Sequence, residues 1–280
     1  MATPLSADRI LKALRDEGVH VVEVRDWRTH NRNHKGPWGP VHGVMIHHTV
    51  TSGTAATVNL CYDGHSTLPG PLCHGVIAKD GTVHLVGNGR ANHAGSGDGD
   101  VLAAVIDERD LPADNETDTD GNRHFYGFEC VNRGDNVDPW PPEQVEAAVR
   151  ASAAICRAHG WGRDGTTSVI GHAEWQPGKV DPRGPGVSMA DIRRRVAERL
   201  RHPASWSPPG ADTHEPPEED DMVDAREAAD EVWRHRLPNE DGRHAGAILR
   251  AAESGVAELR REVRELRALV QQLLDAGKVG

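Results

Sequence analysis

The sequence predicts an α/β fold, because segments with strand patterning alternate along the chain with segments that carry helix signals. The apolar, β-branched run at residues 43–50 is a strong strand candidate. Residues 74–86 predict two short strands joined by a turn at Asp80-Gly81, a dipeptide typical of hairpins. Residues 142–159 predict a helix that a following glycine ends. Together these alternating patterns favour an α/β domain.

The other elements of this domain follow from caps, breakers and apolar runs. They are a helix from Ser6 to Glu17, strands at residues 19–24 and 125–131, and a helix at residues 188–200 that opens with a Ser188–Asp191 capping box. Residues 95–123 are acidic and rich in glycine, and they predict a long loop.

Composition and charge exclude several classes of protein. The chain has 280 residues, with 32 Lys and Arg against 43 Asp and Glu, for a net charge of -11. An acidic chain is not expected to bind nucleic acid nonspecifically, since such binding rests on basic surfaces. A membrane-spanning helix needs an apolar run of about 20 residues, and the sequence has none. The first residues also lack the apolar core of a signal peptide, which favours a cytoplasmic location.

Three parts are expected along the chain. Residues 1–201 have the composition of a globular domain, residues 202–221 form a proline-rich acidic linker, and residues 222–280 form a helical C-terminal module. In the module, apolar residues between 249 and 274 recur at alternating steps of three and four, which predicts a coiled coil and a homo-oligomer. A higher oligomer, a helical hairpin and an amphipathic helix packed on its own domain are the alternatives.

Two short segments carry residues suited to metal chemistry. Side chains alternate across a strand, so His47 and His48 face opposite sides and only one of them can enter a given site. Farther along, His172 precedes Asp181 by nine residues, with a Pro-Gly turn between them. Two histidines and one carboxylate with an open fourth position form a catalytic zinc set. The spacing of either segment alone is only suggestive, but a strand candidate between them carries Glu129, which strengthens the case.

The motifs occur in an ordered series that extends over roughly residues 20–201. They are Ile46-His47-His48-Thr49, Lys79-Asp80-Gly81, Ala91-Asn92-His93-Ala94-Gly95, Gly127-Phe128-Glu129 and Gly171-His172 followed by Pro177-Gly178-Lys179 and Asp181-Pro182. As a set they resemble the type-2 N-acetylmuramoyl-L-alanine amidases, the zinc amidase fold shared with peptidoglycan recognition proteins. The series looks most like the endolysins of phages that infect actinobacteria.

The resemblance implies a mixed, mainly central β-sheet of six strands flanked by helices, with a zinc ion in an open groove. Its zinc ligands would be His47, His172 and Asp181, which leaves His48 as a packing residue on the opposite face. Glu129 matches the acidic residue that handles the proton of water, and Lys179 matches a basic residue that would hold the oxyanion. Residues expected to touch the substrate or support the ligands are His74, Asn92 and His93.

The reaction implied is hydrolysis of the amide between the lactyl group of N-acetylmuramic acid and the L-Ala of the stem peptide. The partner would be bacterial peptidoglycan, reached from the host cytoplasm after holin-type release. A cytoplasmic wall-recycling amidase, a non-catalytic peptidoglycan-binding protein and a virion protein with a passenger amidase domain are the alternatives.

The sequence departs from the family at one position of the hairpin. Several members place a tyrosine before the histidine of that strand, whereas here Cys73 precedes His74. A fourth metal contact or a reactive thiol would be a functional role for Cys73, but a buried cysteine is the more common outcome. We expect all four cysteines to be reduced and buried, because no export signal or paired spacing points to disulfides.

Overall fold

A computed structural model of the chain describes residues 2–162 and 167–207. The predicted C-terminal module, its coiled coil at 249–274 and most of the predicted linker lie outside the described residues. Within the described ranges, no helix is both long enough and apolar enough to cross a bilayer.

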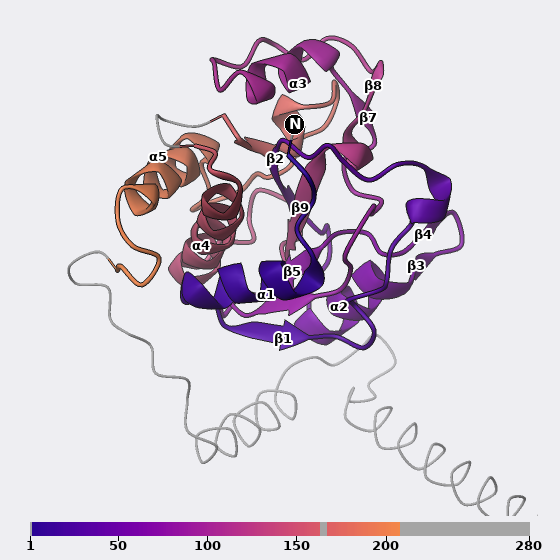
Figure 1. Cartoon of the computed structure of the whole chain (residues 1–280). Coiled ribbons are helices and arrows are strands. Elements are labelled where there is room, and N and C mark those ends of the chain that lie inside the picture. Colours follow the sequence, from indigo (N-terminus) through magenta and orange to yellow (C-terminus); the bar gives the residue numbers. More distant parts are fainter. Residues whose placement is uncertain (1, 163–166, 208–280) are drawn as a thin grey trace, which may run out of the picture. The chain divides into compact units, whose positions relative to one another are not determined.

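The centre of the fold is a six-stranded sheet in the order β1-β6-β5-β9-β2-β10 (Figure 1). Only β5 and β6 are antiparallel to one another, and the other neighbouring pairs are parallel. The strands are β1 (Val21–Glu23), β2 (Gly43–His48), β5 (Gly75–Ile77), β6 (Val83–Leu85), β9 (Phe125–Cys130) and β10 (Val169–Gly171). The expected mixed, mainly central sheet is therefore confirmed.

Three helices cover one face of this sheet. They are α1 (Ala7–Asp16), α4 (Pro142–His159) and α5 (Met189–Leu200), and α4 packs against β2, β5 and β9 (Figure 1). Their contact with the sheet forms the main apolar core, in which Leu14, Ile46, Phe128 and Ile155 are almost completely buried. Helix α2 (Thr54–Asp63) packs against β5, and Val58 and Cys61 contribute to a smaller apolar cluster.

Local sequence signals account for the ends of these helices. Ser6 caps α1 by accepting a hydrogen bond from the backbone N–H of Arg9, and Ser188 caps α5 in the same way through Asp191. Gly160 ends α4 in the left-handed conformation, at φ 76°. These elements lie where the sequence predicts them, within one or two residues at each end.

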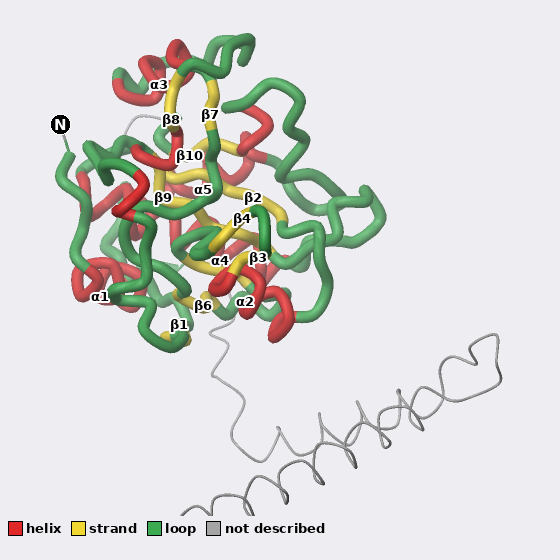
Figure 2. The backbone as a smooth tube through the Cα atoms, turned by 90° about the vertical axis from the view of Figure 1, so that its right-hand side faces the viewer, coloured by secondary structure: helices red, strands yellow, loops and turns green. Residues whose placement is uncertain are grey.

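The prediction that residues 95–123 form one long loop is wrong. It contains helix α3 (Gly99–Ile106) and a two-stranded sheet of β7 (Ser96–Gly97) and β8 (Thr119–Asp120), visible above the main sheet in Figure 2. The reason is that Asp98 caps α3 by accepting from two backbone N–H groups, and the short apolar run after it packs beside Trp175. This apolar run is short and lies in an acidic segment, so the helix pattern is weak in the sequence.

Several short elements have no counterpart in the sequence prediction. Besides α2 and β10, these are a small hairpin of β3 (Gly64–His65) and β4 (Leu68–Pro69) and three 3-10 turns at Asn33–Lys35, Gly121–Arg123 and His172–Glu174. Apart from α2, which has ten residues, each of these elements has only two or three residues, too few for a periodic pattern to predict it.

Side chains of the central strand β2 alternate between the two faces of the sheet. Val44 and Ile46 of β2 join the core beneath α1, α4 and α5, whereas Met45 belongs to a separate cluster on the other face with Trp175. His47 shares the face of Met45, and His48 shares that of Ile46. The sheet thus presents His47 on the side away from the α1, α4 and α5 layer.

Residues 202–207, placed in the linker by composition, still pack on the domain. The carbonyl of His202 accepts from Arg157, the carbonyl of Trp206 accepts from Arg199, and the hydroxyl of Ser207 accepts from Arg150. The boundary at 201 and the extent of the linker stay predictions.

Candidate metal centre

Three adjacent parallel strands bring the candidate residues to one edge of the sheet. In the register of β2 and β9, His47 lies directly opposite Glu129. In the register of β10 and β2, Gly171 lies opposite Ile46, so His172 follows at the level of His47. Carboxyl ends of parallel strands are where open α/β sheets place their sites. Backbone pairing alone therefore places His47, Glu129 and His172 side by side.

Asp181 reaches the same place through a folded loop. The backbone N–H of Ala173 donates to the carbonyl of Asp181 at 2.7 Å, which closes the loop onto its own start. Trp175 anchors the loop, because its ring is fully buried and its Nε1–H donates to the carbonyl of Ala94 at 2.9 Å. Glu174 accepts from the Gly171 N–H and pairs with Arg193. The turn between His172 and Asp181 is thus held at several points.

Three potential ligand atoms converge. Nδ1 of His47 lies 3.0 Å from Nδ1 of His172 and 3.1 Å from Oδ2 of Asp181, and the latter two atoms are 3.2 Å apart. Tetrahedral zinc with bonds of about 2.0–2.1 Å requires ligand atoms about 3.3 Å apart. Among the described residues, this is the one group of three or more His, Cys, Asp or Glu side chains able to hold a metal ion.

The contacts of Nε2 in His47 and His172 determine whether Nδ1 of each ring carries a hydrogen or a lone pair. Nε2 of His47 is 3.1 Å from Nδ1 of His93, and Nε2 of His172 is 3.4 Å from Oε1 of Gln176. If each Nε2 donates outward, the three inner atoms all present lone pairs to one another. Lone pairs so close repel unless a cation lies between them. The donor set and its spacing therefore fit a divalent metal, and two imidazoles with one carboxylate suit zinc.

The electrostatics agree with a cation-binding cluster. Burial would raise the pKa of Asp181, but the close approach of the His172 and His47 rings outweighs burial and holds the pKa well below its usual range. Burial lowers the pKa of His47 to about 4, so its imidazole is neutral at physiological pH. A neutral imidazole and an ionised carboxylate are the forms that bind metals.

Glu129 stands beside this cluster with an unsatisfied oxygen. Its Oε2 is enclosed and has no hydrogen-bond partner among the described residues. Burial, with smaller contributions from Cys61 and Asp181, raises the pKa of Glu129 well above its usual value. An enclosed carboxyl oxygen without a partner is costly in a fold, and such groups concentrate at functional sites.

Lys179 lies on the exposed part of the loop. Its positive charge acts on both neighbouring groups, since it is among the lesser causes that lower the pKa of His47 and oppose the rise for Glu129. No hydrogen bond within the described residues engages its ammonium group.

The three remaining candidates make contacts within the protein. His74 accepts from the Gly127 N–H at 2.9 Å through Nδ1, and its Nε2 is 2.8 Å from the carbonyl of Gly89. The side-chain amide of Asn92 donates to the carbonyl of Pro69 at 2.7 Å. His93 is buried against His47, which favours the supporting role over contact with substrate. Direct substrate binding by these residues stays a prediction.

Two neighbours agree with packing roles. His48 is buried on the opposite face, where its Nδ1 accepts from the Arg183 N–H at 3.2 Å. Cys73 is fully buried in the apolar cluster under α2, and burial raises the pKa of its thiol well above its usual value. All four cysteines are free and buried, as predicted.

Gln176 and Asn122 were missed from the sequence. Gln176 follows His172 by four residues, and that spacing is the one local signal that could have suggested it. Oδ1 of Asn122 accepts from the backbone N–H groups of His93 and Ala94, which are distant from it in the chain, so only the fold brings these residues together.

A protein-family model described as N-acetylmuramoyl-L-alanine amidase matches residues 37–184, more than half of the chain. The chain belongs to this family. The matched region contains the three convergent ligand atoms, Glu129 and Lys179. A search of curated proteins returned no match.

Solved structures of similar fold come from bacterial, phage and animal proteins. The N-acetylmuramoyl-L-alanine amidase LysC from Clostridium intestinale is 17% identical over 63% of this chain and 96% of its own, with a TM-score of 0.43. The Ph2119 endolysin from a Thermus scotoductus bacteriophage is 14% identical over 63% and 99%, with a TM-score of 0.40. Drosophila PGRP-LB is 14% identical over 61% and 92%, with a TM-score of 0.39. The family assignment rests on the family model.

Proposed function

We propose that this amidase is a zinc-dependent hydrolase that cleaves the amide between the lactyl group of N-acetylmuramic acid and L-Ala of the stem peptide. The observation that carries the proposal is the convergence of His47, His172 and Asp181 within 3.2 Å of one another beside a half-buried glutamate. Membership of the amidase family supplies the substrate class.

His47, His172 and Asp181 would hold the metal ion. When bound, zinc would supply a Lewis acid that acidifies water and polarises the scissile carbonyl. Neutral histidines leave the ion with a net positive charge, because the cluster contributes only one carboxylate. Because the ion would keep this positive charge, it could polarise the scissile carbonyl.

Glu129 would act as the proton shuttle. Its enclosed Oε2 has no internal partner, so it is free to accept the proton of the attacking water and deliver it to the leaving amine of L-Ala. The raised pKa suits a group that must hold the proton between these steps. A cation held at the neighbouring cluster would oppose that shift, so the carboxylate form would be more populated.

Lys179 would stabilise the tetrahedral oxyanion. The side chain is exposed, and its positive charge acts on both Glu129 and His47. A group that stabilises a developing oxyanion can lower the activation free energy by about 3 kcal/mol.

Within this reaction class, we favour an endolysin that degrades the wall of the phage's own host. The heptad pattern at 249–274 supports this reading, since self-association would raise avidity for a polymeric substrate. A wall-recycling amidase has no use for avidity. Deleting residues 222–280 should lower wall binding and solution mass; unchanged values for both would refute the role of the module.

The reaction itself is tested on purified peptidoglycan. The full chain should release new L-Ala amino termini, a chelator should stop their release, and added zinc should restore it. His47→Ala should abolish both zinc binding and release, whereas His42→Ala, outside the cluster, should preserve them. Release that continues at full rate without bound metal would refute zinc dependence. Wall binding without any release would favour the non-catalytic alternative.

A further inference from the structure

His93 links a candidate metal ligand to the backbone of the sheet. Its Nε2 lies 3.0 Å from the carbonyl oxygen of Phe125, and its Nδ1 lies 3.1 Å from Nε2 of His47. The two imidazole rings meet edge to face, with centroids 5.2 Å apart and planes at 89°. The side chain of His93 is 8% exposed, so water has little access to compete for these contacts.

The carbonyl contact determines where the hydrogens lie. A carbonyl oxygen only accepts, so Nε2 of His93 must carry the hydrogen and donate it to Phe125. In a neutral ring, Nδ1 of His93 is then an acceptor, and it can only accept from Nε2–H of His47. Nδ1 of His47 is left without a hydrogen, and its lone pair points toward His172 and Asp181. A backbone oxygen thus determines the tautomer of His47 through His93.

The surroundings of His93 are shaped to hold it in this position. Oδ1 of Asn122 accepts from the backbone N–H groups of His93 and Ala94, both at 2.9 Å. Across the ring, Gly127 of β9 provides the space: a Cβ at that position would lie 2.4 Å from Nδ1 of His93. Any side chain at Gly127 would therefore displace the ring from its contact with His47. The location of His93 depends on the fold at both sides.

We propose that His93 is a positioning residue that holds His47 in its metal-binding tautomer and orientation and so sets the affinity of the site for zinc. The inference rests on the proposed zinc site and adds a residue that does not itself bind the metal. Losing a group that orients a metal ligand typically weakens metal binding by about 10- to 100-fold.

Two substitutions separate the acceptor from the shape of the ring. His93→Phe keeps a planar ring against His47 but removes the acceptor, whereas His93→Asn places an amide oxygen close to the position of Nδ1. Zinc dissociation constants are measured on the full chain by competition with a chromogenic chelator. The matched control is His159→Phe, since His159 lies at the end of α4 and stacks on Trp161 behind the sheet.

His93→Phe should weaken zinc binding by about 10- to 100-fold, and His93→Asn should recover most of that loss. The control should bind zinc as the unmodified chain does. Unchanged affinity in His93→Phe would overturn the proposal, and so would an equal loss in His93→Asn. If the unmodified chain bound no zinc, the proposed function would fail instead, so the two failures are distinguishable.

A measurement on the unmodified chain avoids any effect of substitution on folding. Long-range nitrogen–proton NMR of the zinc-loaded protein reports which imidazole nitrogen carries the hydrogen. The expected pattern is a hydrogen on Nε2 of both His47 and His93. A hydrogen on Nδ1 of His47 would overturn the proposal, whatever the variants show.

Discussion

Two glutamates on opposite faces of the sheet differ in whether their carboxylates have partners. Behind the sheet, Glu17 is fully buried, but Arg157 and Arg199 both donate to its carboxylate at 3.0 Å. In front, Oε2 of Glu129 is enclosed without a partner. A buried charge with counter-charges stabilises one arrangement of helices, whereas a buried carboxyl without them is available for chemistry. Of these two acids, the one without a partner is the one beside the candidate metal centre.

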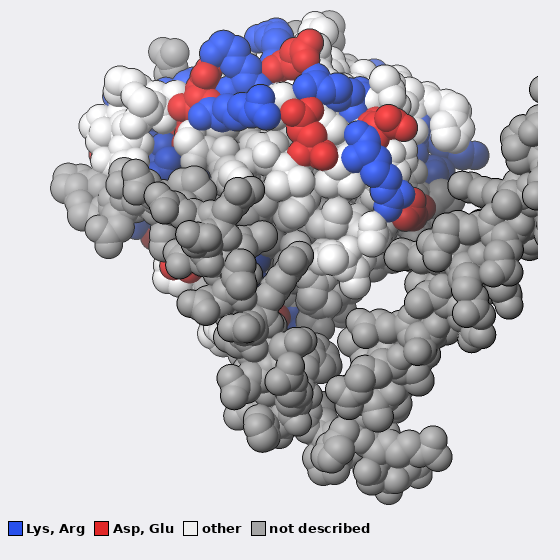
Figure 3. Space-filling model, turned by 90° about the horizontal axis from the view of Figure 1, so that it is seen from below, with Lys and Arg blue, Asp and Glu red and all other residues white. Residues whose placement is uncertain are grey.

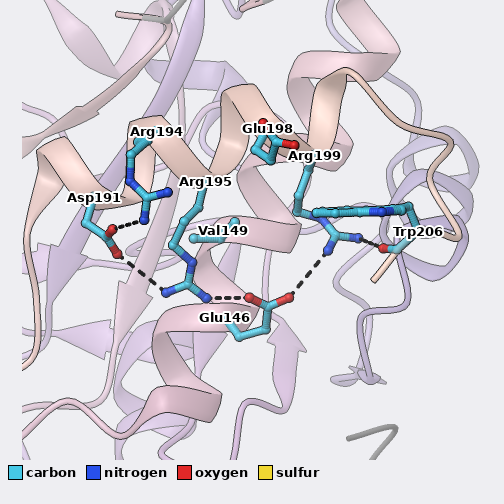
Figure 4. A pocket seen from close by; sticks show the side chains of 8 residues that line it. All are labelled: Glu146, Val149, Asp191, Arg194, Arg195, Glu198, Arg199 and Trp206. Atoms are coloured by element: carbon cyan, nitrogen blue, oxygen red, sulfur yellow. Dashed lines mark hydrogen bonds and ion pairs between the residues drawn. The ribbon is translucent and has the colours of Figure 1, made fainter. Parts of the chain in front are cut away.

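The cavity between α4 and α5 illustrates the satisfied side. It has a volume of about 390 Å³ and is lined by arginines, acids, Val149 and Trp206. Figure 4 shows that Arg195 and Arg199 both turn toward Glu146, while Asp191 forms ion pairs with Arg194 and Arg195. Glu198 pairs instead with Arg201 and His202, outside the lining, so each acidic side chain of this cavity has a basic partner. The cavity is therefore a feature of helix packing and not a rival to the metal centre.

The outer surface near α1 follows the same rule. On the face in Figure 3, basic side chains lie beside acidic ones. Arg28 pairs with Asp8 and Glu23, and Arg25 pairs with Asp63. Exposed pairs of this kind contribute at most about 1 kcal/mol each to stability.

The largest effect is expected at the unsatisfied carboxyl. Glu129→Gln removes the proton shuttle, so turnover on peptidoglycan should fall by about 10²- to 10⁴-fold. Zinc affinity and the free energy of unfolding should not fall, because Glu129 neither binds the metal nor satisfies a charge. Glu143→Gln, on the exposed side of α4, is the control. Full turnover in Glu129→Gln would show that the contrast between the two faces does not mark the catalytic group.

The reverse pattern is expected behind the sheet. Glu17→Gln leaves Arg157 and Arg199 without their buried counter-charge, so the free energy of unfolding should drop by about 3–5 kcal/mol. Zinc affinity of the folded protein should not change. Chemical denaturation measures the loss, with Asp16→Asn at an exposed pair as the control. A loss as small as that of the control would mean that the network contributes no more than a surface pair.

Acid should weaken the fold through a buried imidazole. Burial lowers the pKa of His74 to about 4, while an unfolded histidine titrates near 6.5. The stability that neutral His74 contributes is therefore complete above pH 6.5 and decreases as the pH falls toward 4, by up to about 3 kcal/mol. Denaturation with a chelator present, from pH 7 to 4.5, should show the decline. An NMR titration of the His74 ring with a midpoint near 6.5 would contradict this prediction.

The smallest effect is expected at Cys73. Cys73→Ala opens a small void in the cluster under α2 and should cost about 1 kcal/mol of stability. Zinc affinity should stay the same, because the cysteine is a packing residue. A loss of zinc affinity measured by chelator competition would instead assign Cys73 to the metal, and the packing interpretation would be wrong.

Much of the site was accessible from the sequence because its residues lie in local motifs. His47 and Glu129 sit on strands whose alternation and apolar content predict them, and His172 and Asp181 flank a turn that two breaker residues mark. Helix α3 was not predicted, because it lacks a clear local pattern. Its apolar run is short and lies in an acidic segment, and its stability comes from packing beside Trp175 and not from periodicity.

Local sequence determined where helices begin and end and which side of β2 each histidine faces, because capping and alternation act between neighbours in the chain. Only the tertiary structure decided that three parallel strands end at one edge and that Asp181 closes onto His47. It also decided that His93 connects His47 to the carbonyl of Phe125, across Gly127. Contacts between residues far apart in sequence depend on strand register and packing, which no local pattern encodes.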